Sequence, residues 1–162
     1  MLKTLGYVLL GIIGLLIILQ FVAKPEKINE PITPDDIVEQ LQVNADISQM
    51  LKAACYDCHS NQPKYPWYAS VAPISWRIAE HIEVGRSELN FSEWGSYSKR
   101  RKDHKLEEML EEVQTRHMPL AAYVNMHPEA KEVLTQTHIE KLKNWVNSER
   151  AKLESDTTST QP

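Results

Sequence analysis

The sequence predicts an all-α fold behind one N-terminal membrane-spanning helix. In several stretches between residues 34 and 150, apolar residues recur every three or four positions, which is the period of an amphipathic helix. No long run alternates with the period of two that a half-buried strand requires. The first two dozen residues, by contrast, are apolar almost throughout. These observations together predict a small helical domain that follows a membrane anchor.

The N-terminal apolar run covers residues 5–23 and reads LGYVLLGIIGLLIILQFVA. About 20 such residues cross a bilayer as a helix, whereas a cleaved signal peptide has a shorter apolar region and small residues at its cleavage site. We therefore expect residues 1–23 to be a retained single-pass transmembrane anchor that contacts membrane lipid. Lys3 on one side and Lys24 and Lys27 on the other leave its orientation open.

The composition of residues 24–33 indicates an extended linker, because they include proline and their apolar residues follow no regular spacing. The helical domain then spans residues 34–150. Its first helix is predicted to have Thr33 as N-cap and Pro34 at the first helical position, and to end near Asn44. Asp46 is expected to cap a second helix that leads into the segment CYDCH and has its apolar stripe at Ile47, Met50, Leu51 and Ala54.

The second half of the domain predicts three further helices. Pro73 is expected to open one that stops at Gly85, and a polar connection over residues 89–105 follows. The next helix ends before Met118, since the residue before a proline avoids helical angles. A final helix has its apolar stripe at residues 139–146, and residues 151–162 are expected to be a disordered tail.

The charge balance argues against a polyanionic partner. Asp and Glu number 22 against 18 Lys and Arg, which gives a formal net charge of −4. A nucleic-acid-binding domain usually carries an excess of basic residues. We therefore predict no nucleic-acid partner.

The segment CYDCH, residues 55–59, contains both cysteines of the chain. A structural zinc site needs four Cys or His ligands, usually with a second CxxC or HxxxH element, and the sequence contains no such element. A thioredoxin-like dithiol sits at the start of a helix in a βαβ unit, and no strand pattern is present. Zinc and a redox dithiol are therefore the weaker alternatives.

Covalent haem uses every functional residue of the motif. Cys55 and Cys58 can each add to one vinyl group of the same porphyrin, and His59 can bind the iron from the proximal side. One CxxCH motif predicts one covalent haem c with its iron. Because c-type haem is attached outside the bacterial cytoplasm, we expect a domain anchored in the cytoplasmic (inner) membrane that faces the periplasm.

Three segments of the chain resemble the bacterial haem-binding domain family, which occurs in membrane-anchored or exported c-type cytochromes. They are CYDCHSNQPKYPWY, VGRSELNFSEW and MPLAAYVNMHPEA, and a Trp-bearing final helix follows them. The resemblance spans about residues 33–148. It implies an all-helical, c-type cytochrome-like domain with one haem, and it does not identify the redox partners.

The sixth iron ligand is expected to be Met118. The segment RHMPL resembles the distal loop of many small cytochromes c, and a Met/His pair raises the reduction potential of the iron. His117 is the rival ligand, and simple packing of Met118 against the haem edge is the alternative role. Trp67, Tyr68 and Tyr123 are secondary candidates, which we expect to line the haem crevice.

Two classes of function fit these residues. The favoured one is a non-catalytic electron carrier with outer-sphere transfer, because two fixed axial ligands keep reorganisation small. The alternative is a haem-based gas sensor or a peroxidase-like module, in which the sixth position is open; a structural subunit is a third possibility. No segment resembles an effector domain. Whether the protein is an enzyme is left open, and no catalytic residue is assigned.

Overall fold

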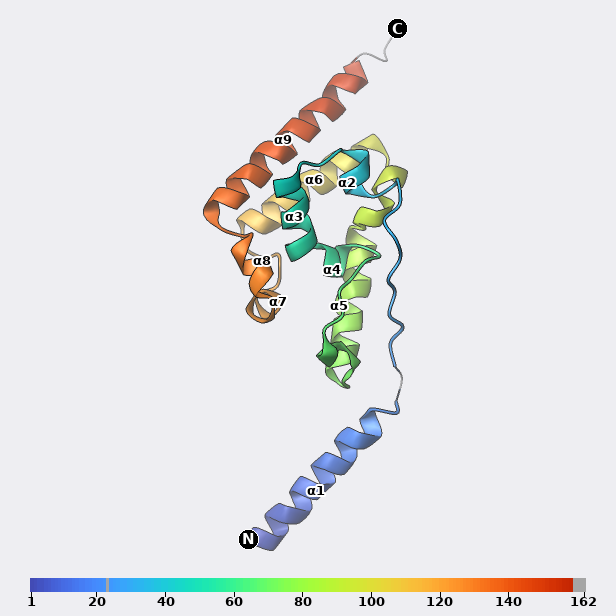
Figure 1. Ribbon diagram of the computed structural model, residues 1–162, viewed down its shortest axis with the longest axis vertical. Coiled ribbons are helices and arrows are strands. Elements are labelled where there is room, and N and C mark those ends of the chain that lie inside the picture. Colours follow the sequence, from blue (N-terminus) through green and yellow to red (C-terminus); the bar gives the residue numbers. More distant parts are fainter. Residues whose placement is uncertain (23, 159–162) are drawn as a thin grey trace.

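The computed structural model describes residues 1–22 and 24–158, and every regular element in those residues is a helix (Figure 1). The all-α fold class is therefore confirmed. The helices surround a core near the C-terminal end of the molecule, while the N-terminal helix lies apart at the opposite end (Figure 1).

Helix α1 (Leu2–Leu19) forms within the apolar N-terminal run. It ends four residues before the predicted end of the anchor, where the Gln20 side chain donates to the Leu16 carbonyl and also pairs with both backbone groups of Ala72. Within the described ranges, no helix combines the length and apolar character that crossing a bilayer requires. The predicted transmembrane helix is therefore not supported. Ala23, its expected last residue, lies outside the described residues.

Two short side chains begin the next helices, and neither is the one predicted. Asp36, not Thr33, caps α2 (Ile37–Gln40), where its Oδ1 accepts from the Val38 amide at 3.0 Å. Asn44, not Asp46, caps α3 (Ala45–Ala54), where its Oδ1 accepts from the Ile47 amide at 3.0 Å. Thr33, Asp36, Asn44 and Asp46 all have a side-chain oxygen that can cap a helix. The sequence therefore cannot choose among them, and tertiary packing decides where each helix begins.

The CYDCH segment forms the one-turn helix α4 (Tyr56–His59), and η1 (Trp67–Ser70) follows in the loop. Helix α5 (Ile74–Glu88) begins after Pro73 as predicted, but it runs through Gly85. The expected stop at Gly85 is wrong because this glycine serves close packing, as described below. The expected polar connection contains η2 (Phe91–Ser96), in which Phe91 and Trp94 are fully buried.

The C-terminal half consists of α6 (Lys99–Gln114), α7 (Ala121–Met126), α8 (Pro128–Glu132) and α9 (Gln136–Thr158). Helix α9 continues through residues 151–158, which differs from the disordered tail predicted there. Leu153 explains the difference, because its half-buried side chain packs against the core. Residues 159–162 lie outside the described residues.

The core lies between α2, α3, η2, α6 and α9. Helices α6 and α9 pack against each other, and the Arg150 guanidinium of α9 donates to Asp103 of α6 at 2.6 Å. The largest fully buried side chains are contributed by η2, α2, α3, α6 and α9: Trp94, Phe91, Ile37, Ile47, Leu51, Leu106 and Val146. The apolar stripe predicted for α3, the helix that leads into CYDCH, is therefore confirmed as part of the core.

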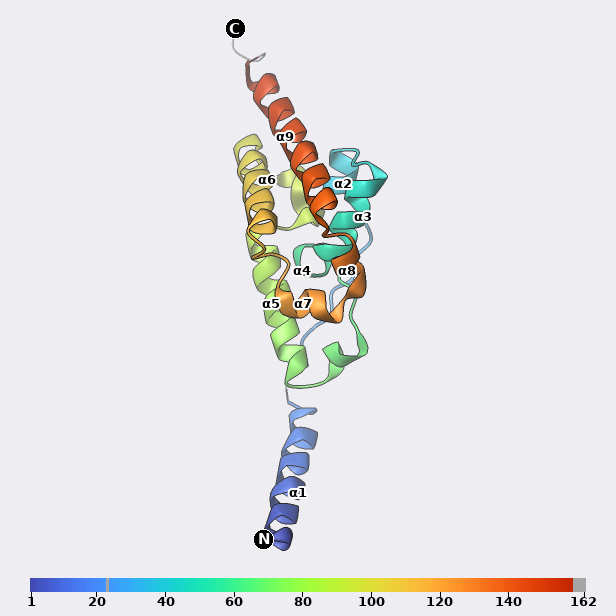
Figure 2. The ribbon, with the colours of Figure 1, turned by 90° about the vertical axis from the view of Figure 1, so that its left-hand side faces the viewer.

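Two helices, α5 and α7, flank the motif. Helix α4 lies at the edge of the core, with α5 on one side and α7 on the other (Figure 1). In the view turned by 90°, α5 and α7 lie just below α4 (Figure 2). Helix α5 packs against α4, and Tyr123 of α7 donates a hydrogen bond to Asp57 of α4.

Candidate functional site

The local backbone explains how three motif side chains come together. Helix α3 ends at Ala54, and the chain then makes one further turn in which the His59 amide donates to the Cys55 carbonyl at 2.9 Å. Residues three and four positions apart lie on the same face of a helical turn. Cys55, Cys58 and His59 have this spacing, so the turn presents both thiols and the imidazole together.

The His59 ring is oriented by a backbone carbonyl. Its Nδ1 lies 3.0 Å from the oxygen of Leu89, so we assign the proton to Nδ1, which donates this hydrogen bond. Burial lowers the pKa of His59, which favours the neutral imidazole at neutral pH. The other nitrogen, Nε2, then carries a lone pair. This is the arrangement in which a second partner fixes the tautomer of a metal-binding histidine.

The two cysteines are free thiols in half-buried positions. Burial raises the pKa of Cys55 to about 12, and it raises the pKa of Cys58 to about 11. Both groups are therefore protonated at neutral pH and are weak nucleophiles as they stand. This environment disfavours a redox dithiol, for which a lowered thiol pKa is typical.

The residues after the motif are fixed to η2. The Asn61 amide donates to the Ser92 hydroxyl at 3.0 Å, and the Asn90 side chain donates to the Asn61 side-chain oxygen at 2.9 Å. Ser60 is fully buried and donates to the Tyr56 carbonyl at 2.7 Å. These contacts fix the chain directly after His59, and the Leu89 carbonyl fixes its ring. No local pattern of residues 89–92 marks them as part of the site, although they lie in the family-like segment VGRSELNFSEW.

Aromatic side chains pack behind the imidazole. Phe91 stacks on Tyr56 with ring centroids 5.4 Å apart, and its ring lies 6.2 Å from that of His59. The Tyr56 hydroxyl donates to the buried Asp36 carboxylate at 2.6 Å. The proximal side of the site is therefore part of the hydrophobic core.

Gly85 brings α5 into direct contact with the motif. A Cβ added at this position would lie 2.6 Å from the Cys58 carbonyl oxygen and 3.2 Å from the Cys58 Cβ. No real side chain tolerates the shorter distance, so only glycine allows α5 to approach α4 this closely.

The candidate distal residues lie on the segment between α6 and α7. Met118 is 38% exposed, and its amide donates to the Glu112 carbonyl at 3.1 Å. With Pro119, Val124 and Leu134 it lines a cavity of about 240 Å³. His117 is exposed and lies 3.7 Å from the Glu112 carboxylate, an exposed pairing that suits a surface residue. Iron ligation by Met118 stays a prediction.

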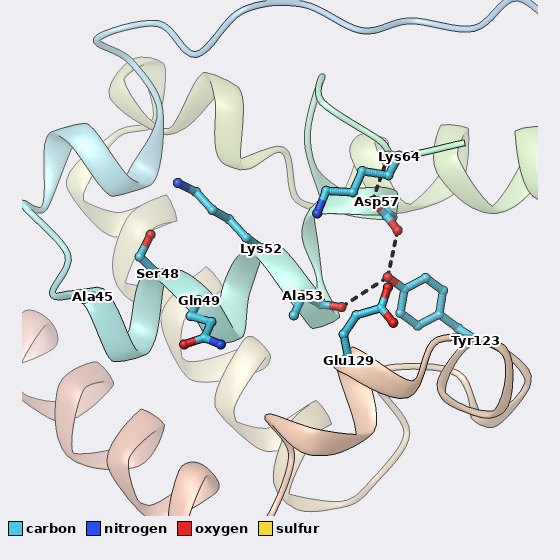
Figure 3. Close-up of a pocket in the computed structure, with 9 residues that line it drawn as sticks. All are labelled: Ala45, Ser48, Gln49, Lys52, Ala53, Asp57, Lys64, Tyr123 and Glu129. Atoms are coloured by element: carbon cyan, nitrogen blue, oxygen red, sulfur yellow. Dashed lines mark hydrogen bonds between the residues drawn. The ribbon is translucent and has the colours of Figure 1, made fainter. Parts of the chain in front are cut away.

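The three secondary candidates are placed differently. Trp67 is 80% exposed and contacts Tyr68 edge-to-face, with ring centroids 5.8 Å apart. Tyr123 is half-buried, and its hydroxyl donates to the Asp57 carboxylate at 2.8 Å (Figure 3). Burial and then the Asp57 charge raise the pKa of Tyr123, so the hydroxyl keeps its proton. Of these three, Tyr123 is the one joined to the motif by a hydrogen bond.

A pocket of about 440 Å³ opens beside this hydrogen bond (Figure 3). It is lined by residues of α3, α4, α7 and α8 and by Lys64 in the loop after α4. Its charges are mixed, with two lysines beside Glu129 and Asp57.

The residues present fit a haem. The donor set consists of two thiols and an imidazole nitrogen with a free lone pair, all on one helical turn. Helix α5 and the segment before α7, which flank α4 in Figure 1, carry large exposed apolar side chains: Ile74, Val84, Met118 and Leu120. Such donors, with exposed apolar side chains on the flanking elements, suit an apolar cofactor with a metal centre.

Comparison with known proteins agrees with this geometry. A family model described as a haem-binding domain matches residues 14–148. A search of curated proteins and a search of solved structures each found no match. The family match includes the CYDCH turn, its η2 support and the segment with Met118 and Tyr123, and it covers well over half of the chain. The chain therefore belongs to the haem-binding domain family, and haem is its cofactor.

Proposed function

We propose that this protein is a monohaem c-type cytochrome domain that carries single electrons by outer-sphere transfer. The observation that supports the proposal best is the turn at residues 55–59. It presents two free thiols together with an imidazole whose Nδ1 is already committed to the Leu89 carbonyl. Thioether attachment uses two such thiols, and a proximal iron ligand uses the remaining imidazole nitrogen.

The residues of the chain have distinct tasks in this function. When bound, haem supplies an iron centre that changes between ferrous and ferric states. Cys55 and Cys58 would hold the porphyrin through thioethers, and His59 would bind the iron through Nε2. The Leu89 carbonyl keeps the His59 ring in one orientation and tautomer. Phe91 and Tyr56 keep water away from the proximal side.

Covalent attachment outside the cytoplasm is the first testable part of this proposal. We expect the full chain, made in a bacterium with periplasmic haem-attachment machinery, to carry haem that remains bound after denaturation. Replacing both Cys55 and Cys58 with Ala is expected to abolish this covalent haem, because no thiol is left to form a thioether. The measurement is the pyridine haemochrome spectrum of the denatured, acid-extracted protein.

Two further arms complete the attachment experiment. A chain that lacks residues 1–22 and has no other export signal is expected to stay free of covalent haem, since we propose a periplasmic location. Replacing the exposed Glu83 with Ala serves as the control and is expected to leave the haem content unchanged. Covalent haem on the variant without cysteines would refute thioether attachment.

The state of the sixth position distinguishes an electron carrier from a sensor or a peroxidase-like module. With Met118 as the second axial ligand, the ferrous protein is expected to stay six-coordinate and to bind carbon monoxide slowly. Replacing Met118 with Ala is expected to open the position and to raise the carbon monoxide association rate at least tenfold. Stopped-flow absorption spectroscopy of the two ferrous proteins measures this difference.

Replacing Met126 with Ala is the matched control, because Met126 is exposed on the same segment. If the unmodified protein binds carbon monoxide as fast as the Met118→Ala variant, the electron-carrier proposal fails and ligand binding becomes the better function. If the Met118→Ala variant stays six-coordinate, the sixth ligand is another residue, and His117 is the next candidate.

A further inference from the structure

The segment that carries the candidate distal ligand is weakly held by apolar packing. Helix α7 follows Met118 closely and has no fully buried residue; Tyr123 and Val124 are half-buried. At the start of the segment, the Met118 amide donates to Glu112, and the Arg116 side chain donates to the Leu134 carbonyl at 3.0 Å. These contacts join the start of the segment to α6 and to the residues after α8, and neither joins it to the iron-binding turn.

One polar contact makes that connection. The Tyr123 hydroxyl donates to Asp57 Oδ2 at 2.8 Å and lies 3.3 Å from the Ala53 carbonyl oxygen (Figure 3). Asp57 stands between the two motif cysteines, and Ala53 lies in the last turn of α3. A hydrogen bond to a carboxylate is among the stronger neutral-donor contacts.

Both partners are held in place before they meet. The other Asp57 oxygen, Oδ1, accepts from the Lys64 amide at 2.8 Å, which fixes the carboxylate. The Tyr123 ring stacks on the His127 ring with centroids 4.0 Å apart and planes 15° apart, and His127 Nδ1 lies 2.9 Å from the Tyr123 carbonyl oxygen. The contact therefore joins two preorganised groups and loses little side-chain entropy.

We propose that Tyr123 is a positioning residue, whose hydrogen bond to Asp57 fixes the segment 118–126 against the iron-binding turn and so controls how the sixth position is filled. The inference rests on the proposed function for its effect on iron. The positioning itself depends only on the contacts described above. It differs from the expectation that Tyr123 simply lines the haem crevice, because the hydroxyl is already donated to the motif.

The experiment compares the haem-loaded full chain with Tyr123→Phe and Tyr65→Phe variants. Tyr123→Phe removes only the hydroxyl and keeps the ring that stacks on His127. Tyr65→Phe is the matched control, since it removes a hydroxyl that accepts from the Ile28 amide of the linker and leaves the Tyr123–Asp57 hydrogen bond in place. Hydrogen exchange is measured at the Val124 and His127 amides, which donate to Leu120 and Tyr123 inside this segment.

We expect Tyr123→Phe to speed exchange at these two amides by roughly tenfold or more, because local opening no longer breaks a charge-assisted hydrogen bond. Tyr65→Phe is expected to leave both rates within twofold of the unmodified protein. The carbon monoxide association rate of the ferrous Tyr123→Phe protein is expected to rise by a factor of about three or more. Unchanged exchange at Val124 and His127 would overturn the positioning role.

A double-variant cycle separates this link from general loosening. Asp57→Ala alone is expected to speed exchange as Tyr123→Phe does, and the pair together is expected to add little, because both remove the same contact. Full additivity would refute the link. Fast carbon monoxide binding by the unmodified protein would refute the electron-carrier function alone, since the exchange rates do not depend on the sixth ligand.

Discussion

Replacing Gly85 with Ala is expected to destabilise the domain by about 2 kcal/mol and to lower the yield of covalent haem. In the middle of an exposed helix this change normally adds about 1 kcal/mol of stability. Here the new Cβ would lie 2.6 Å from the Cys58 carbonyl oxygen. The contacted atoms are backbone, so relief requires α5 or the motif turn to move, at a cost of about 3 kcal/mol. The steric cost therefore exceeds the helix-propensity gain.

Urea unfolding and the haemochrome spectrum measure the two effects of Gly85→Ala. The matched control is Gly11→Ala in α1, where an added Cβ meets nothing within 4 Å. That variant is expected to leave both the unfolding free energy of the domain and its haem yield unchanged. A Gly85→Ala protein more stable than the unmodified chain would show that α5 does not press against Cys58.

Replacing Phe91 with Ala is expected to produce the largest loss of stability, about 3–5 kcal/mol. Phe91 is 1% exposed and stacks on Tyr56, and its ring lies near that of His59. The substitution leaves a cavity behind the imidazole as well as losing buried apolar area. A domain of this size is stable by about 5–15 kcal/mol, so the loss is a large fraction of the total.

Chemical unfolding at low temperature measures this loss, because a variant that has lost this much stability is partly unfolded at higher temperature. Phe91→Leu is the companion variant, which refills most of the space without an aromatic ring and is expected to cost about 1.5 kcal/mol. An unfolding free energy for Phe91→Ala within 1 kcal/mol of the unmodified protein would contradict the placement of Phe91 in the core.

The sequence predicted the helices whose apolar stripes follow the helical period and failed where tertiary packing decides. The stripe of α3, with Ile47, Met50 and Leu51, was predicted and is buried. Phe91 and Trp94 were assigned to a polar connection, because a short 3₁₀ helix has no repeating apolar stripe to detect. Gly85 was interpreted as a helix stop, although its absent side chain serves the contact with Cys58.

Part of the candidate site was predictable from local spacing alone. Cys55, Cys58 and His59 lie within one turn, so their grouping follows from the sequence. The carbonyl that orients His59 is the backbone carbonyl of Leu89, 30 residues away. Because every residue has a backbone carbonyl, the sequence does not indicate which one is the partner. Tyr123 is expected near the site from the sequence, but its hydrogen bond to the half-buried Asp57 is seen only in the fold.

The distances along the chain between contacting residues imply an order of maturation. His59 and Leu89 are 30 residues apart, whereas Tyr123 and Asp57 are 66 residues apart. A polypeptide that emerges from its N-terminus therefore exposes both thiols and the support for His59 well before the Met118 segment appears. If the haem is attached covalently, as proposed, its loading could start before the C-terminal part of the chain arrives. Tyr123 would then join the segment 118–126 to a turn that already carries its cofactor.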